Sequence, residues 1–377
     1  MHILINASNL KAGGSLQVAD SLCGLLGEFP QHEFVVVLSR ALRATAGRVR
    51  SLPNVRVVEH DVRNDWRTLL QGRDRVLDGL VNRHAVEAVL TVFGPSRWIP
   101  KCLHISGFAR SQLILRRSPY YLRRRPLRER LADALSCRLL WFYFKRCAKV
   151  YFTENPYVTE RLSAMLPGRR VYTVTNYYNQ AYDHPEQWRR RELPPFRGTT
   201  LLTVTAAYPH KNLPIAIDVA RALRREHPGF AFRFVMTIDR TEFPPFEEEL
   251  APHFVFTGRV DITECPSLYG QADVMFQPTL LECFSATYPE AMKMERPIVT
   301  TDIEFAHGLC GAAARYYSPL SPRDAARAIY EVATDASLRR RLVEAGREQL
   351  GRFDTYTERA HKLIGIVEQE AARWRGR

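Results

Sequence analysis

The chain has 377 residues, which is too long for one ordinary domain. Because 46% of these residues are hydrophobic, two domains could each bury a core. Its seven cysteines are odd in number and never spaced as C-x-x-C, which argues against a disulfide framework or a zinc knuckle and is typical of a reducing cytosol. The net charge of +14 is uneven, because residues 110–149 hold twelve Lys or Arg against Glu129 and Asp133. Such a patch attracts the phosphates of nucleic acid, anionic lipid or a phosphorylated substrate.

The sequence leads us to expect neither a secretory signal nor a membrane span. The first eight residues, MHILINAS, lack a basic region followed by a long apolar stretch. The longest apolar run, residues 131–144, is short and contains Asp133 and Arg138. We therefore expect a cytoplasmic protein.

Short apolar runs alternate with amphipathic stretches along the first half of the chain. Strands are predicted at residues 2–7, 34–39, 55–60, 88–93, 103–108, 149–153 and 171–175. Helices are predicted between several of them, at residues 16–26 and 66–81 among others. This alternation is typical of a parallel sheet with helices on both faces.

The alternation stops at residues 179–198, which are polar and contain proline, and we interpret this segment as a linker between domains. It restarts with strands at 200–205, 232–237, 254–257, 273–277 and 298–301 and a helix at 214–226, and residues 321–377 look helical throughout. The sequence thus predicts an α/β fold of two Rossmann-like, doubly wound domains facing a cleft. The expected divisions are domains at 1–178 and 199–355 and a C-terminal helix at 356–377 that crosses back to the first domain.

Two loops carry residues suited to phosphate. Gly13 and Gly14 stand between the first strand and the first helix, where bare backbone amides and the helix N-terminus favour an anion; a simple tight turn is the equally good alternative. The pair is not the G-x-G-x-x-G dinucleotide fingerprint. Lys211 follows the first strand of the second domain, at the carboxyl edge where doubly wound sheets bind ligands. A lysine there suits a diphosphate.

The strongest motif, PTLLECFSATYPEAMKMERPIVTTD at residues 278–302, contains the candidate glutamates Glu282 and Glu290. Glu282 precedes the junction between a loop and a helix at 283–286, and Glu290 is expected about two turns along that helix. A carboxylate accepts two hydrogen bonds and so suits the paired hydroxyls of a ribose or hexose. A capping or ion-pairing role for Glu290 is the alternative.

This motif, together with PHKN, TGRV, LYGQADVMFQPT and the start ILINASNLKAGGSLQ, resembles the family 4 retaining glycosyltransferases of GT-B architecture, of the bacterial surface-polysaccharide and O-antigen type. The resemblance covers most of the chain. It implies that Glu290 holds the ribose of a nucleoside-diphosphate sugar and that Glu282 lies near the transferred sugar. The donor would also contact a further set of residues: Gly13, Gly14, Lys211, Gly258, Arg259, Val260, Cys283, Phe284, Ser285 and Ala286.

The resemblance also sets expectations for catalysis. Lys211 and Glu282 would act at the reacting centre, and His104 is the candidate histidine beside the acceptor, although a histidine on an apolar strand is more often a core residue. The family commonly has an arginine five residues before the lysine; this chain has Ala206, and Arg259 is a candidate substitute. Because no Asp-x-Asp occurs, no metal ion and no other cofactor is expected.

The basic window at 110–149 mixes arginines with Leu, Tyr, Trp and Phe. We interpret it as a surface that lies on anionic lipid, where a lipid-linked or polysaccharide acceptor would be met, on the inner face of the cytoplasmic membrane. The residues expected on this surface are Arg116, Arg117, Arg123, Arg124, Arg125 and Arg128. Two alternatives remain: a nucleotide-sugar epimerase or hydrolase of the same fold, and a basic nucleic-acid-binding protein, against which the two-domain layout counts.

Overall fold

The computed structural model describes residues 1–11, 13–62, 65, 67–122 and 126–376, which fold into two compact units. Unit 1 consists of Met1–Ile114, Arg125–Asn176 and Asp354–Arg377, and unit 2 of Leu115–Arg124 and Tyr177–Phe353. Residues 179–198, expected as a linker, therefore belong to unit 2, and the C-terminal helix belongs to unit 1.

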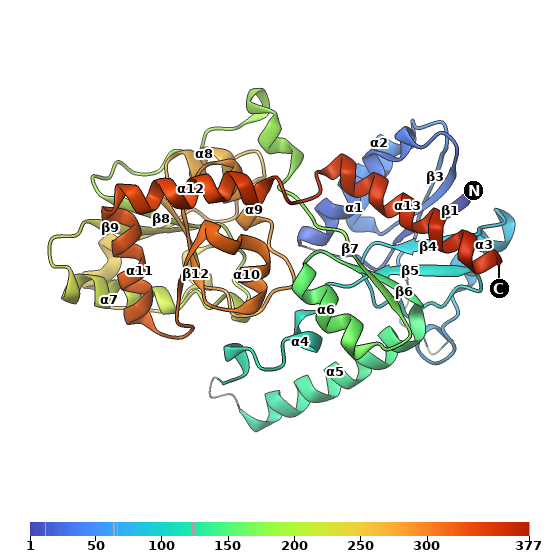
Figure 1. Ribbon diagram of the computed structural model, residues 1–377, viewed down its shortest axis with the longest axis horizontal. Coiled ribbons are helices and arrows are strands. Elements are labelled where there is room, and N and C mark those ends of the chain that lie inside the picture. The colour runs from blue at the N-terminus through green and yellow to red at the C-terminus, as the bar shows by residue number, and fades with distance from the viewer. Residues whose placement is uncertain (12, 63–64, 66, 123–125, 377) are drawn as a thin grey trace. The chain divides into compact units, whose positions relative to one another are not determined.

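Over its described residues, unit 1 contains a seven-stranded parallel sheet in the order β3-β2-β1-β4-β5-β6-β7 (Figure 1). The strands are β1 (His2–Ala7), β2 (Glu33–Leu38), β3 (Val55–Glu59), β4 (Ala88–Thr91), β5 (Leu103–Gly107), β6 (Val150–Thr153) and β7 (Arg170–Thr173). The helices are α1 (Gly14–Gly24), α2 (Arg43–Val49), α3 (Arg75–Arg83), α4 (Ser111–Ile114), α5 (Leu127–Cys147), α6 (Pro156–Met165) and α13 (Tyr356–Arg375).

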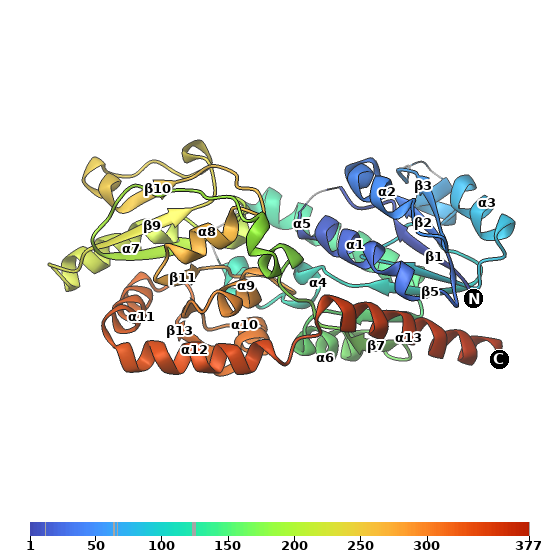
Figure 2. The ribbon, with the colours of Figure 1, turned by 90° about the horizontal axis from the view of Figure 1, so that it is seen from above.

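Helices cover both faces of this sheet. The apolar sides of α1, α2 and α13 pack with one face of β1, β2 and β4 in a single core, and Figure 2 shows α1 and α13 side by side. On the other face, Leu77 and Leu80 of α3 pack with Trp98 against Leu4 and Val35. Strands buried on both faces read as continuous apolar runs, which is why the sequence indicated them.

Helix α13 is fixed to unit 1 by buried charge as well as by apolar packing. Arg359 forms an ion pair with Glu154 over 3.0 Å, and the side chains of both are 6% exposed. Arg359 also donates to the carbonyl of Thr175 over 3.1 Å. Thr355 and Glu358 form a capping box at the start of the helix, which satisfies its first free backbone amides.

Unit 2 contains, in the part that is described, a six-stranded parallel sheet in the order β10-β9-β8-β11-β12-β13. The strands are β8 (Thr199–Thr203), β9 (Phe232–Met236), β10 (Phe254–Phe256), β11 (Val274–Gln277), β12 (Ile298–Thr301) and β13 (Ala314–Tyr317). The helices are α7 (Ile215–Glu226), α8 (Cys265–Gly270), α9 (Thr287–Lys293), α10 (Glu304–Cys310), α11 (Pro322–Thr334) and α12 (Ala336–Leu350). Helices α7 and α11 pack side by side against one face of this sheet.

The predicted doubly wound α/β class is confirmed, while two helical predictions need correction. The stretch 66–81 is not one helix: a π-helical turn covers Arg67–Gln71 and α3 begins only at Arg75, because Gly72 has φ +68° and Asp74 caps the new helix. Position 66 itself lies outside the described residues. The stretch 321–377 is three helices, of which α12 begins after its N-cap Asp335 and α13 after its N-cap Thr355.

Candidate active site

Two charged side chains meet at the carboxyl edge of the unit 2 sheet. Lys211 ends a short 3₁₀ turn that follows β8, and Glu282 lies in the loop after β11. Because β8 and β11 are hydrogen-bonded neighbours, their carboxyl ends bring the two loops together. Lys211 Nζ forms an ion pair with Glu282 Oε1, and these side chains are only 13% and 12% exposed. The structure therefore joins two of the predicted site residues in a largely buried pair.

Neighbouring groups hold this pair in place. Thr279 Oγ1 donates to Glu282 Oε1 over 3.1 Å, and His210 Nε2 lies 3.9 Å from the same carboxylate oxygen. The amide of Leu280 donates to the carbonyl of His210 over 2.8 Å, which ties the two loops together. Ser118 Oγ donates to the carbonyl of Leu280 over 2.5 Å, so part of the basic window packs into unit 2.

Glu290 is within the electrostatic influence of the same lysine. It lies in the first turn of α9 rather than two turns along it, and is 4% exposed. The hydroxyl of Tyr269 donates to its Oε2 over 3.5 Å, and Tyr182 faces the carboxyl group from residues 179–198. Burial raises the pKa of Glu290 to about 7, against the opposing influence of the two phenol groups and of the positive charge of Lys211. One lysine thus acts electrostatically on both predicted carboxylates.

The loop between the two glutamates leads directly into α9. Cys283 and Ser285 are buried, and Ser285 Oγ is 2.9 Å from Thr287 Oγ1. The ring of Phe284 packs edge-on against Phe353 at 6.2 Å between centroids. Ala286 is the residue immediately before the helix, and its carbonyl accepts from the amide of Glu290 over 2.9 Å.

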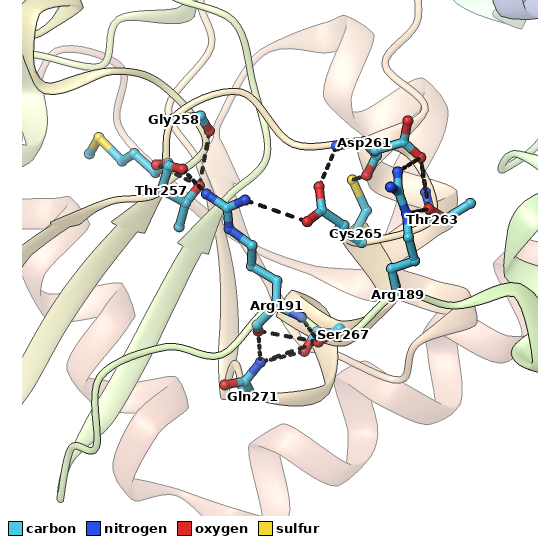
Figure 3. Close-up of polar contacts among 11 residues, drawn as sticks. Arg189, Arg191, Thr257, Gly258, Asp261, Thr263, Cys265, Ser267 and Gln271 are labelled. Carbon is cyan, nitrogen blue, oxygen red and sulfur yellow. Dashed lines mark hydrogen bonds and ion pairs between the residues drawn. The ribbon is translucent and has the colours of Figure 1, made fainter.

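The loop after β10 contains Gly258, Arg259 and Val260. The amide of Gly258 donates to the carbonyl of Ile238 over 3.1 Å, and the φ of Gly258 is +70°, a conformation that favours glycine. The side chain of Arg259 is exposed. Figure 3 shows how arginines from residues 179–198 reach this loop.

The predicted residues of unit 1 do not form a comparable cluster. His104 is the second residue of β5, away from the carboxyl end of the strand, and it is 5% exposed. Its Nε2 lies 2.8 Å from Thr91 Oγ1, and its Nδ1 bonds the carbonyl of Cys147. Burial lowers the pKa of His104 to about 4, so it is a neutral, fully bonded core histidine. The structure thus places the predicted catalytic histidine in the core of unit 1 and not at an open edge of the sheet.

Gly13 and Gly14 stand at the start of α1, as expected. Gly13 is the N-cap with φ +77°, and Gly14 is the first residue of the helix. A side-chain carbon built on either glycine would meet nothing within 4 Å. The backbone is thus open at this point, and the contact of these amides with a diphosphate stays a prediction.

The described residues of the predicted basic surface are divided between the two units: Arg128 lies on α5 of unit 1, and Arg116 and Arg117 belong to unit 2. Arg116, Arg117 and Arg128 are exposed, whereas Arg123, Arg124 and Arg125 lie outside the described residues. Four leucines that recur every fourth residue on α5 are exposed: Leu127 by 67%, Leu131 by 61%, Leu135 by 70% and Leu139 by 48%. This helix therefore presents an apolar stripe beside basic side chains.

Two features are absent from the described residues. No group of three or more His, Cys, Asp and Glu side chains is arranged there to hold a metal ion. Among the same residues, no helix is both long enough and apolar enough to span a bilayer.

The sequence of unit 2 matches one family model. The match covers residues 198–335 and the model describes "Glycosyl transferases group 1". Residues 198–335 are a glycosyl transferases group 1 domain. This group 1 domain contains Lys211, Glu282 and Glu290, which are the charged residues that the geometry brings together. No curated protein matches the sequence.

Solved structures similar to the whole chain share its two-unit architecture, the GT-B fold. A glycosyltransferase from Rickettsia africae superposes with a TM-score of 0.69 at 15% identity, covering 98% of this chain and 97% of that one. WaaG, a glycosyltransferase involved in lipopolysaccharide biosynthesis, gives 0.65 at 13%, covering 97% and 99%. Anabaena Alr3699/HepE, solved with UDP and glucose, gives 0.64 at 12%, covering 97% and 99%. At these identities the likeness establishes the fold alone.

Three residues of the site region were missed by the sequence reasoning. Tyr182 and Arg191 come from residues 179–198, and Tyr269 comes from α8. The sequence did contain one indication that this segment is packed against a domain. The predicted linker begins next to two tyrosines and contains a third, which is unusual for a solvent-exposed linker.

Proposed function

We propose that this protein is a glycosyltransferase that moves a hexose from a nucleoside-diphosphate sugar to a lipid-linked or cell-surface glycan acceptor. The observation that carries the proposal is the cluster of Lys211, Glu282 and Glu290 at the carboxyl edge of the group 1 domain. Parallel α/β sheets bind ligands at this edge. The solved neighbour that holds UDP and glucose, and WaaG with its role in lipopolysaccharide biosynthesis, support this choice of donor and acceptor class.

Each charged residue has a part in the proposed mechanism. Glu290 would accept hydrogen bonds from the ribose hydroxyls, and Glu282, with the backbone of residues 283–286, would hold the sugar. Lys211 would leave its ion pair with Glu282 in favour of the diphosphate, which carries more negative charge. As the bond between sugar carbon and phosphate oxygen breaks, charge accumulates on the departing diphosphate. A well-placed cation lowers the barrier to such a step by about 3–4 kcal/mol.

Retention of configuration and independence of metal ions belong to the proposal on the strength of the family resemblance. Both are measurable once a donor is known. The anomeric configuration of the product by NMR tests the first. Turnover that persists in excess chelator tests the second.

A thermal-shift panel of nucleoside diphosphates and their sugars, recorded in the presence of chelator, tests the donor. A ligand present at 100 times its Kd adds about 2.7 kcal/mol to stability. We expect at least one donor to stabilise the protein, Glu290→Ala to abolish that shift, and the variant to keep its far-UV spectrum. A panel without any response would refute the proposal. Donor breakdown without acceptor would favour a hydrolase or epimerase instead.

We further propose that α5 meets an anionic membrane surface on which the acceptor is held. The exposed leucines support this, because a stripe of four is more than a helix normally leaves in water. Basic side chains near lipid headgroups contribute about 1 kcal/mol each, and the exposed Arg128 lies on the same helix as the stripe.

Vesicle flotation separates the apolar contribution of the leucines to membrane binding from the electrostatic contribution of the arginines. We expect the protein to float with vesicles of phosphatidylcholine and phosphatidylglycerol and to float less with phosphatidylcholine alone. The double variant Leu131→Ser/Leu135→Ser should lose flotation on both. Leu320→Ser, which changes an exposed leucine of unit 2, is the matched control and should behave as the parent does. Equal flotation of all three proteins would reject the surface.

A further inference from the structure

Residues 188–193, here called the strap, run beside the loop Thr257–Glu264, which follows β10. Arg191 lies at the centre of the contact: one guanidinium nitrogen donates to the carbonyl of Thr257, and another lies 3.4 Å from Glu264 Oε1. The main chain of Arg191 is bonded as well, to Ser267 and Gln271 of unit 2. Figure 3 shows the side chain of Arg191 extending toward Thr257 while its backbone stays beside Ser267 and Gln271.

Arg189 holds the other half of the same loop. Its amide donates to the carbonyl of Thr263 over 3.0 Å, and its Nε donates to Thr263 Oγ1 over 3.0 Å. Its guanidinium pairs with Asp261 over 3.1 Å, and Asp261 in turn accepts from the amide of Thr263 over 3.0 Å. The loop is therefore fastened at two points to a segment that precedes it by about seventy residues.

The fastened loop lies at the Glu290 end of the site. Helix α8 begins at Cys265, directly after the loop, and carries Tyr269, whose hydroxyl reaches Glu290. The segment that includes the strap also supplies Tyr182, which faces the same carboxyl group. The proposed function takes Glu290 as the residue that binds the ribose, and the nucleobase is attached to that ribose. The loop Thr257–Glu264 is connected to Glu290 through α8, so it is the candidate loop for contacting the nucleobase.

We propose that Arg191 is a positioning residue that presets the loop Thr257–Glu264 for the nucleobase of the donor, with Arg189 as its partner, and thereby sets nucleobase selectivity. The inference rests on the proposed function, because it takes Glu290 as the ribose-binding residue. A loop held in its binding conformation before the ligand arrives avoids the entropy loss of ordering during binding. Without Arg191, the carbonyl of Thr257 and the carboxylate of Glu264 lose their shared cation and the loop is free to take other conformations.

A merely structural arginine would lower stability without changing which base is preferred, so selectivity is the deciding measurement. We would titrate UDP, GDP, ADP and CDP, and separately inorganic pyrophosphate, into the full chain by calorimetry. The variants are Arg191→Ala, the conservative Arg191→Lys and the control Arg190→Ala. Arg190 is the adjacent arginine, its side chain is 82% exposed, and it pairs only with Glu192 among the contacts of the described residues.

We expect Arg191→Ala to weaken the preferred nucleoside diphosphate about tenfold, as the loss of one charged hydrogen bond does, and to shrink its preference over the other three bases. Pyrophosphate binding should change less than about twofold, since no phosphate contact is removed. Arg191→Lys should recover part of the preference and Arg190→Ala should match the parent. An unchanged order and ratio of affinities in Arg191→Ala would overturn the inference, even if its melting temperature falls. If the parent binds none of the four, it is the proposed function that fails.

Discussion

The raised pKa of Glu290 makes unit 2 less stable as the pH rises through neutrality. Burial raises this pKa from 4.5 to about 7 in the folded protein, a difference of about 2.5 pH units, and each unit corresponds to ~1.4 kcal/mol. The folded state therefore holds a proton that the unfolded chain releases at lower pH. The contribution is fully present below pH 4.5 and is lost as the pH rises through about 7, a decrease of roughly 3 kcal/mol in the free energy of unfolding.

Glu290→Gln tests this sign, because the amide has a similar shape and cannot ionise. We would measure urea unfolding of the parent and of Glu290→Gln between pH 5 and pH 8. The difference between the two curves cancels every other titrating group. We expect the parent to lose about 1.4 kcal/mol per pH unit relative to the variant, until the loss levels off above about pH 7. Identical slopes would show that Glu290 titrates as an exposed glutamate does, and the geometry described around it would be wrong.

Three further predictions use other charged or strained positions. Lys211→Ala should weaken nucleoside-diphosphate binding by about ten- to hundredfold in calorimetry and should raise the pKa of Glu290 further, because a positive charge that opposes the shift is removed. Gly258→Ala should lower the melting temperature by about 2–6 °C, since a φ of +70° costs a non-glycine residue roughly 1–2 kcal/mol. Arg359→Met should cost ~3–5 kcal/mol in urea unfolding because it leaves Glu154 buried without its partner, and the added change Glu154→Gln should recover most of that loss.

The fold was predictable because its strands are buried on both faces. Runs such as Phe34–Leu38 are apolar at every position and end at polar turns, so the strand positions agree with the structure to within a residue or two. The prediction failed where a single residue overrides the pattern. Gly72 and Asp74 interrupt the helical period at 66–81, and β13, Ala314–Tyr317, was missed because ARYY mixes a charged residue with aromatics.

The charged residues of the candidate site were predictable because a residue that follows a parallel strand lies at the carboxyl edge of the sheet. Lys211 and Glu282 follow two strands of one parallel sheet, and the carboxyl ends of such strands share an edge. The contacts of Tyr182 and Arg191 follow no such rule. Of residues 179–198 only Tyr182 and Leu193 are buried, and two such positions form no repeat of 2 or 3.6 residues that would reveal a buried face. A segment without hydrophobic periodicity is therefore not always a linker between domains.

Ala206 leaves Lys211 without the second cation that the family resemblance implies, and the structure places His210 next to it. His210 stacks on Tyr208 at 5.6 Å between ring centroids and lies 3.9 Å from Glu282. Burial lowers the pKa of His210, the charge of Lys211 lowers it too, and Glu282 acts in the opposite direction, so the imidazole is neutral at pH 7. An incoming diphosphate would add negative charge beside this ring and raise its pKa, so that ligand binding takes up a proton. Under the proposed function, Lys211 and His210 would then both face the diphosphate, and the charge of the histidine would depend on the bound ligand.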